Sequence, residues 1–228
     1  MVLSDLDGAD AVSAELPGSL SVAADQTSET AIVSMIDAAE QAFGPVDLYF
    51  ANAGVAIGTD PMDDEDTWDL AFAVNVHAHR WAARRLLPGW LARGEGYFCS
   101  TASAAGLVAQ IGSAPYSVTK HAAVAFAEWL SITYGNHGLR VSCLCPQGVN
   151  TNMVRRAEEL GGGGNVVRAV GTILEPEDVA DVVVEAIEDE RFLILPHPEV
   201  AKYMALKGSD HERWLAGMRK LQQRVVGY

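Results

Sequence analysis

The chain has 228 residues, of which 49% are hydrophobic, and its 30 acidic residues outnumber its 16 lysines and arginines, giving a net charge of −14. This composition supports a large buried core and excludes a chain that is mostly disordered. It also lacks the excess of positive charge with which proteins bind nucleic acid or anionic membranes. No run of 18 apolar residues is present, and the N-terminus does not resemble a signal peptide. We therefore expect a cytoplasmic protein without a nucleic-acid or membrane partner.

Short apolar runs alternate with longer helical patterns along the whole chain, with no internal repeat. This alternation is typical of a parallel sheet covered by helices on both faces. We predict an α/β fold, a doubly wound parallel sheet of the Rossmann-like type in three αβα layers, with residues 1–228 forming a single domain. The predicted strands are Val2–Asp5, Leu20–Ala24, Val46–Ala51, Gly96–Ser100, Arg140–Cys145 and Phe192–Leu195. The predicted helices are 8–15, 28–43, 67–91, 115–136, 176–189 and about 198 to the end.

Several helix ends carry local signals. Thr27–Thr30 has the hydroxyl groups and the acid of a helix start, and Gly44-Pro45 closes that helix. Glu175–Asp178 starts another helix, with proline and acids in the first turn. The acidic run Asp60–Asp66 also precedes a helix, where carboxylates face the positive end of the helix dipole. We interpret this run as a solvated helix start rather than a metal site.

Three cysteines, Cys99, Cys143 and Cys145, are an odd number and contain no Cys-x-x-Cys pair. All three fall on or at the end of predicted strands. This pattern favours buried, reduced thiols over a disulfide or a zinc site, so we predict no metal.

The strongest chemical pattern is formed by Ser103, Tyr116 and Lys120. Pro115 suits the first turn of a helix, and Tyr116 and Lys120 then lie four residues apart on one helix face. A nearby ammonium favours the phenolate, so we expect Lys120 to lower the pKa of Tyr116 and make it an acid and base. Ser103 follows a predicted strand at the sheet edge where parallel sheets bind ligands. Its hydroxyl can hold a substrate oxygen.

A four-glycine stretch, Gly161–Gly164, separates two helical patterns and is too flexible to hold its own shape. It fits a mobile lid or a plain surface loop equally well. The surrounding segment 152–173 is predicted to be an apolar substrate lid, which favours an apolar carbonyl compound over a sugar or an acid. Its apolar residues are Met153, Val154, Val166, Val167 and Val170, and Leu107, Val108 and Ile111 are expected on the opposite side.

Four motifs together resemble the short-chain dehydrogenase/reductase family, over nearly the whole chain. Ala51–Gly54 resembles the family's Asn-Asn-Ala-Gly turn, with alanine in place of the first asparagine. Asn75 falls where the family keeps a catalytic asparagine, and Ser103 lies thirteen residues before Tyr116 as in the family. Cys145–Thr151 resembles the Pro-Gly-x-x-x-Thr stretch, with Gln147 in place of glycine.

The resemblance implies a role for each of these residues. Tyr116 would donate or accept the proton, and Lys120 would tune it and bind the nicotinamide ribose. Ser103 would orient the substrate oxygen, Asn75 would hold a water in the proton relay, and Thr151 would contact the carboxamide. The implied cofactor-binding set is Asp5, Asp25, Asn52, Ala53, Gly54, Tyr116, Lys120, Pro146 and Thr151. We expect all six histidines to be structural or surface groups.

Asp5 resembles the acid that binds the adenosine ribose in this family and favours NAD over NADP, and Asp25 resembles the aspartate that touches the adenine. Only four residues precede Asp5, so the family's first strand and Gly-rich turn have no counterpart in residues 1–228. That strand lies at the sheet centre in the family, and we expect a gap there about two strand spacings wide, roughly 9.6 Å. A neighbouring strand could slide over, or another chain could donate one. We favour a third explanation, that the sequence is a shortened version of a longer protein.

These observations predict an NAD-dependent oxidoreductase that transfers a hydride between the nicotinamide and a secondary alcohol or ketone, and that forms a homodimer or homotetramer. Two alternatives stay open. One is an inactive truncated remnant that acts as a binding or dimerisation module, and the other is a lyase or epimerase that uses the same tyrosine.

Overall fold

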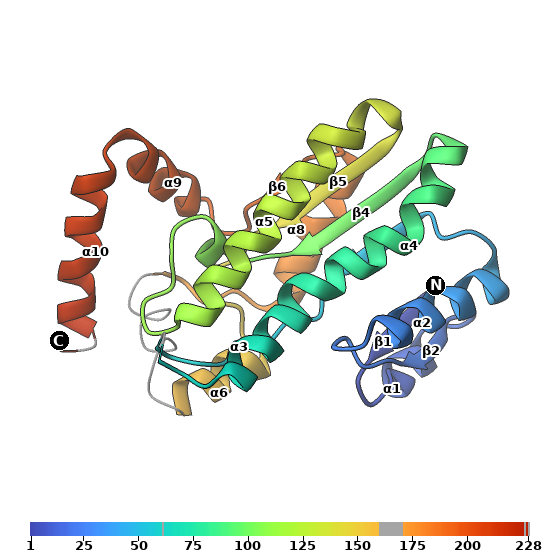
Figure 1. The fold of residues 1–228 in the computed structure, drawn as a ribbon, viewed down its shortest axis with the longest axis horizontal. Helices are drawn as coiled ribbons and strands as arrows, with labels where there is room; N and C mark the ends of the chain where they lie inside the picture. The colour runs from blue at the N-terminus through green and yellow to red at the C-terminus, as the bar shows by residue number, and fades with distance from the viewer. Residues whose placement is uncertain (61, 160–170, 226, 228) are drawn as a thin grey trace.

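The computed structural model describes residues 1–60, 62–159, 171–225 and 227, and shows parallel strands flanked by helices (Figure 1). The glycine stretch 161–164 and the predicted lid residues Val166, Val167 and Val170 lie outside the described residues. The strands are β1 (Val2–Asp5), β2 (Leu20–Ala23), β3 (Leu48–Ala51), β4 (Gly96–Thr101), β5 (Leu139–Leu144) and β6 (Leu193–Ile194). Every predicted strand is confirmed, with ends that differ by at most two residues.

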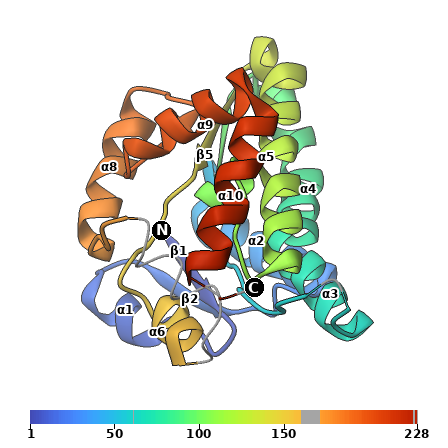
Figure 2. The same ribbon diagram turned by 90° about the vertical axis from the view of Figure 1, so that its left-hand side faces the viewer.

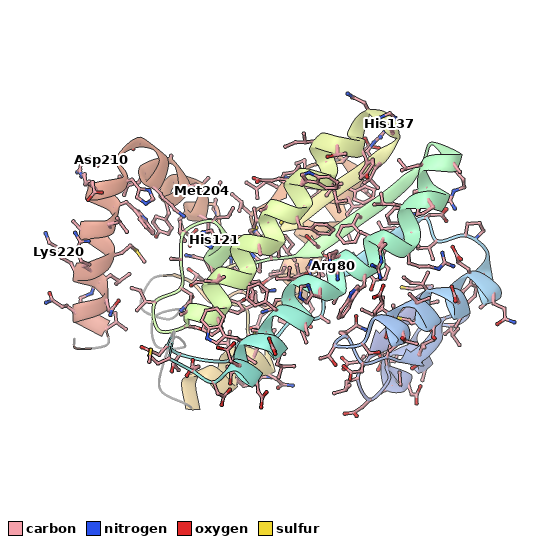
Figure 3. The ribbon with its side chains drawn as sticks, viewed as in Figure 1. Arg80, His121, His137, Met204, Asp210 and Lys220 are labelled. Carbon is pink, nitrogen blue, oxygen red and sulfur yellow. The ribbon has the colours of Figure 1, made fainter. Side chains whose placement is uncertain are left out.

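The described helices follow the predicted order with three differences in detail. They are α1 (Asp10–Glu15), α2 (Glu29–Phe43), α3 (Glu65–Phe72), α4 (Ala78–Arg93), α5 (Ala114–Tyr134), α6 (Asn152–Glu159), α8 (Pro176–Glu188), α9 (Glu199–Ser209) and α10 (His211–Val225). The predicted helix 67–91 is interrupted by a π-helical turn, Ala73–His77. The predicted C-terminal helix bends at Asp210, where the backbone leaves the helical region and the carboxylate accepts a hydrogen bond from the Arg213 N–H at 2.9 Å (Figure 3). Helix α6 agrees with the helical pattern noted before the glycine stretch, although no bounds were predicted for it.

The strands form two separate parallel sheets. β1 pairs with β2, while the larger sheet has the order β3-β4-β5-β6. Among the described strands, none pairs with the outer edge of β1 or of β3, so the expected gap is present and β1 has not moved over to fill it. The gap leaves apolar side chains of β3 exposed, with Leu48 at 40% and Phe50 at 37%.

Helices cover both faces of the larger sheet. α4 and α5 lie side by side on one face, and α8 packs on the other (Figure 2). The smaller sheet is attached through α2, which packs against α4. Arg85 of α4 forms ion pairs with Asp37 at 2.7 Å and Glu40 at 2.5 Å. Such partly exposed pairs contribute about 0–1 kcal/mol each. Burial of apolar side chains of α2 is worth about 1.5–3 kcal/mol for each one, and therefore dominates this attachment.

The local signals at helix ends behave as predicted. Ser28 caps α2 by accepting a hydrogen bond from the Ala31 N–H, and Gly44 ends this helix with a φ of +84°. Asp64, within the acidic run, caps α3 by accepting from the Thr67 N–H at 2.8 Å. In the described part of the chain, no group of acidic, histidine and cysteine side chains has the arrangement of a metal site. The three cysteines are buried and free, and no described helix is long and apolar enough to cross a membrane.

Candidate active site

Three loops meet at one edge of the larger sheet. Asn52–Gly54 follow β3, Ala102 and Ser103 follow β4, and Cys145–Thr151 follow β5. Because β3, β4 and β5 are parallel, their carboxyl ends share one edge, which is where open α/β sheets bind ligands. The motifs that were recognised separately in the sequence are therefore brought to one place.

Ser103, Tyr116 and Lys120 come together at this edge. Pro115 lies in the first turn of α5, so Tyr116 and Lys120 are one helical turn apart on the same face. The Lys120 Nζ lies 5.6 Å from the centre of the Tyr116 ring and donates a hydrogen bond to the Thr101 carbonyl at 3.0 Å. The Ser103 side chain lies near the Tyr116 phenol and influences its pKa. A substrate oxygen held by Ser103 would thus lie beside the tyrosine hydroxyl.

The pKa of Tyr116 is raised from its ordinary value, and the expectation that Lys120 would lower it is wrong for this structure. Burial of the phenol is the main cause, because it penalises the charged phenolate, and the Ser103 side chain opposes this effect only in part. The ammonium of Lys120 is directed at the Thr101 carbonyl instead of the phenol oxygen. Tyr116 is therefore a proton donor in its resting form.

Lys120 is only 2% exposed, and burial lowers its pKa to about 8. Burial lowers this pKa because it penalises the charged ammonium. The groups that oppose this effect are Cys143 and Cys145, and no carboxylate is among them. The lysine can therefore lose its proton at a mildly alkaline pH. A buried amine with this behaviour next to a tyrosine is an arrangement that is enriched in functional sites.

Replacing Lys120 by methionine is expected to increase the free energy of unfolding at pH 7 by about 1–3 kcal/mol, because it removes a buried charge while losing one hydrogen bond. The folded protein releases this proton near pH 8 and the unfolded chain near 10.5, so the unfolded chain binds more protons between these values. Stability of the parent should rise with pH in this window, and the advantage of Lys120→Met should shrink. Urea unfolding of both proteins from pH 7 to pH 10 measures the difference, and a pH-independent difference would contradict the assignment.

Asn75 is fully buried in the π-helical turn, and both N–H donors of its side-chain amide are used. The amide oxygen accepts a hydrogen bond from the Val55 N–H at 2.9 Å, and the amide nitrogen donates to the Val55 carbonyl at 2.9 Å and to the Thr119 hydroxyl at 3.0 Å. These bonds fasten the loop after β3 to helix α5. The predicted water-binding role of Asn75 stays a prediction, and the amide group itself is committed to other partners.

The residues around Lys120 fit the nicotinamide-ribose end of a dinucleotide. Gly54 packs closely against this site, since a Cβ atom at this position would lie 3.2 Å from the Lys120 Nζ and 3.4 Å from the Asn75 amide oxygen. The Asn52 amide oxygen accepts a hydrogen bond from the Thr101 hydroxyl at 2.8 Å, which holds the preceding turn in place. Ala53 lies in the same turn. A side chain at position 54 would crowd the Lys120 ammonium, so glycine keeps the lysine free for a ribose.

The predicted adenosine-binding acids lie on the smaller sheet. Asp5 ends β1, and its carboxylate accepts a hydrogen bond from the Leu6 N–H at 2.6 Å. Asp25 follows β2 and accepts from the N–H and the hydroxyl of Thr27, both at 2.8 Å, which lowers the pKa of this carboxyl. Lys120 lies at the larger sheet, and no strand pairing joins the two sheets among the described residues. Residues 1–228 supply no Gly-rich turn there to hold a pyrophosphate.

Two predicted contacts come from the loop after β5. The Pro146 carbonyl accepts hydrogen bonds from the Ala104 N–H at 2.9 Å and the Ser103 hydroxyl at 3.4 Å. Thr151 lies further along the same loop, with its N–H bonded to the Val149 carbonyl at 2.7 Å. Pro146 therefore touches the Ser103 loop, whereas no contact among the described residues joins Thr151 to Tyr116.

The sequence analysis gave no role at the site to Thr101, Thr119 or His197. Thr101 receives the lysine, and Thr119 receives the Asn75 amide. His197 was expected to be structural, and it is buried and hydrogen-bonded to the loop after β5. None of them stands in a recognisable motif, although Thr119 could have been found from its position next to Lys120 on a helix that was already predicted.

A family model described as short chain dehydrogenase matches residues 3–160 of the chain. The chain belongs to this family. It is 34% identical over 214 residues to 1-deoxy-11-beta-hydroxypentalenate dehydrogenase of Streptomyces exfoliatus, covering 87% of this chain and 74% of that protein. It is 31% identical over 193 residues to estradiol 17-beta-dehydrogenase 11 of Pongo abelii, covering 81% of this chain but only 61% of that protein.

A solved structure of a short-chain dehydrogenase/reductase from Burkholderia phymatum in complex with NAD is similar to this fold. The two have a TM-score of 0.81 and 30% sequence identity, and the match covers 92% of this chain and 84% of that one. The predicted fold class, a Rossmann-like parallel sheet with flanking helices, is thereby confirmed. Members of this family are oxidoreductases that act on hydroxyl and keto compounds. This agrees with the predicted interconversion of an alcohol and a ketone.

Proposed function

We propose that this protein is an NAD-dependent oxidoreductase that interconverts a secondary alcohol and a ketone, with an apolar substrate. The observation that carries the proposal is the meeting of Ser103, Tyr116 and Lys120 at the carboxyl edge of the sheet, with the Lys120 Nζ 5.6 Å from the Tyr116 ring. NAD is favoured over NADP by Asp5, since an acid at the end of this strand suits free ribose hydroxyls and repels a phosphate. The cytoplasm is the proposed compartment.

In the reductive direction, Ser103 would donate a hydrogen bond to the ketone oxygen and Tyr116 would deliver the proton to it. A bound nicotinamide would supply the hydride. The raised pKa of Tyr116 keeps this proton available for transfer to the developing alkoxide. Lys120 and the backbone at Gly54 would hold the nicotinamide ribose, and the Asp25 carboxylate would face the adenine. Asn52, Ala53, Pro146 and Thr151 complete the proposed cofactor set.

The test is a search for activity in an extended chain, defined here as residues 1–228 preceded by a strand, a Gly-rich turn and a helix of the kind that the resembling family uses. Formation of reduced nicotinamide would be followed with a panel of apolar secondary alcohols, with NAD and NADP compared. Turnover with NAD on an apolar alcohol supports the proposal. Turnover on none of these alcohols in a folded, NAD-binding extended chain would contradict it.

The split sheet favours a second candidate function for residues 1–228 by themselves. Open edges on β1 and β3, together with exposed Leu48 and Phe50, suit a binding or dimerisation module that does not catalyse. A thermal-shift assay with NAD separates the two functions, because only a cofactor-binding chain is stabilised by the ligand.

We further propose that the chain forms a dimer through α4 and α5. The outer face of α5 exposes Trp129 at 53% and Ile132 at 82%, an apolar surface that a second copy would cover. The other aromatic residues considered for this interface, Trp68, Phe72, Trp81 and Phe126, are half-buried.

Light scattering at micromolar concentration should give a dimer or a tetramer, and Ile132→Asp should reduce the mass. Val184 on α8 is a matched control, since it is 56% exposed on the opposite side of the sheet. Val184→Asp should leave the mass unchanged. A monomeric parent protein would remove the proposed interface.

A further inference from the structure

A buried histidine links the loops that follow β5 and β6. His197 follows β6 and is 2% exposed. Its Nδ1 lies 3.1 Å from the backbone nitrogen of Gln147, and its Nε2 lies 3.1 Å from the Thr172 carbonyl oxygen. A backbone N–H can only donate and a carbonyl can only accept, so Nδ1 is the acceptor and Nε2 carries the proton. The hydrogen-bond partners therefore define a single tautomer of a neutral ring.

The peptide group that His197 contacts is the same one that Ser103 contacts. The N–H of Gln147 and the carbonyl of Pro146 belong to one planar peptide unit, and no cis peptide bond is present in the described chain. In a trans unit, the N–H and the carbonyl point in opposite directions. His197 holds the N–H side, while the carbonyl side accepts from the Ser103 hydroxyl at 3.4 Å and from the Ala104 N–H at 2.9 Å. Rotation of the N–H would move the carbonyl with it.

The second hydrogen bond of His197 holds the segment that pairs with the loop after β5. Leu174 lies beside the loop after β5, because its N–H donates to the Gly148 carbonyl at 3.0 Å and its carbonyl accepts from the Asn150 N–H at 2.9 Å. His197 bonds to Thr172, just before this paired segment. The ring is thus placed between the segment that contains Leu174 and the peptide that touches Ser103.

We propose that His197 is a positioning residue that acts through the Pro146–Gln147 peptide. By fixing the N–H, it orients the carbonyl that receives Ser103, and so sets where the Ser103 hydroxyl lies relative to Tyr116. Without the ring, the Gln147 N–H loses its partner, and the peptide is held only through its carbonyl, by Ala104 and Ser103. The importance of this geometry for turnover rests on the proposed function, whereas the orientation of the peptide does not.

Three substitutions separate the two bonds of the ring. His197→Asn places an amide oxygen near the position of Nδ1 and can still accept from Gln147, whereas His197→Gln places its amide near the position of Nε2 and can still donate to Thr172. His197→Ala removes both bonds. Amide hydrogen exchange in residues 1–228 reads the result directly and needs no cofactor. The exchange of the Gln147 amide is expected to be about tenfold faster in the alanine and glutamine variants and within about twofold of the parent in the asparagine variant.

Two controls distinguish this role from a general loss of stability. The amide of Phe98, in the middle of β4, should exchange similarly in the asparagine and glutamine variants. His79 is a matched buried histidine whose ring nitrogens have no hydrogen-bond partner within the described structure. His79→Asn should therefore leave the exchange of Gln147 unchanged relative to Phe98. Equal exchange of Gln147 in the asparagine and glutamine variants, or unchanged exchange in the alanine variant, would overturn the proposal.

The same variants in the extended chain test the consequence for turnover. The kcat should fall about tenfold in His197→Gln and recover in His197→Asn, with the KM for the alcohol changing less than the kcat. A faster exchange of the Gln147 amide in His197→Gln than in His197→Asn, combined with the same kcat in the two variants, would overturn the link from the peptide to Ser103. Failure of the proposed function is seen separately, as normal turnover in Tyr116→Phe.

Discussion

Replacing Tyr116 by phenylalanine in the extended chain is expected to reduce turnover by at least about 100-fold, the effect typical of losing a general acid. The substitution keeps the ring packed beside Lys120 and removes only the hydroxyl that Ser103 contacts. Affinity for NAD should change little, because the phenol hydroxyl contributes less to cofactor binding than to proton transfer. Steady-state kinetics with an apolar alcohol, together with NAD titration, measures both quantities.

Two comparisons make this result specific. Tyr134 lies at the end of the same helix, away from the site, and Tyr134→Phe should retain turnover. Lys120→Ala should reduce both turnover and NAD affinity, since the lysine is proposed to contact the ribose as well as to influence the tyrosine. Near-normal turnover in Tyr116→Phe would show that another group transfers the proton.

Residues 1–228 by themselves are expected to show no NAD or NADP binding below millimolar concentration, and no dehydrogenase activity. The pyrophosphate of the cofactor carries two negative charges, and this chain has a net charge of −14 with no Gly-rich turn to direct backbone N–H groups at them. The residues at the nicotinamide end remain in place, but they meet only part of the cofactor. Isothermal titration calorimetry with each dinucleotide measures the affinity.

The extended chain is the matched comparison for this prediction. An added strand between β1 and β3 would pair with both open edges and cover the exposed Leu48 and Phe50. The extension should therefore restore NAD binding and raise the melting temperature together. Micromolar binding of NAD by residues 1–228 alone would falsify the prediction and require a nucleotide site rebuilt from other residues.

The sequence by itself determined the described strands, most of the described helices, and their order. Alternating apolar runs located every strand, and short-range signals such as Ser28, Gly44 and Asp64 marked helix ends, because these patterns depend only on residues close in the chain. The four-residue spacing of Tyr116 and Lys120 likewise placed both on one face of α5. Short-range chemistry and motif order were thus sufficient to predict the fold class and the meeting of the site loops.

Tertiary structure alone decided how these groups behave. Burial raises the pKa of Tyr116 and lowers that of Lys120, and neither direction can be derived from their spacing, because burial is produced by segments distant in the chain. The link from His197 to Gln147 spans 50 residues and joins two loops that no local pattern connects. The hydrogen bonds of Asn75 are also long-range. Its side-chain amide, in the π-helical turn, bonds to Val55 and to Thr119, which lie on other segments. Solvent exclusion and long-range hydrogen bonds exist only once the chain has folded. They determine the pKa values and the orientation of side chains whose positions the sequence had already indicated.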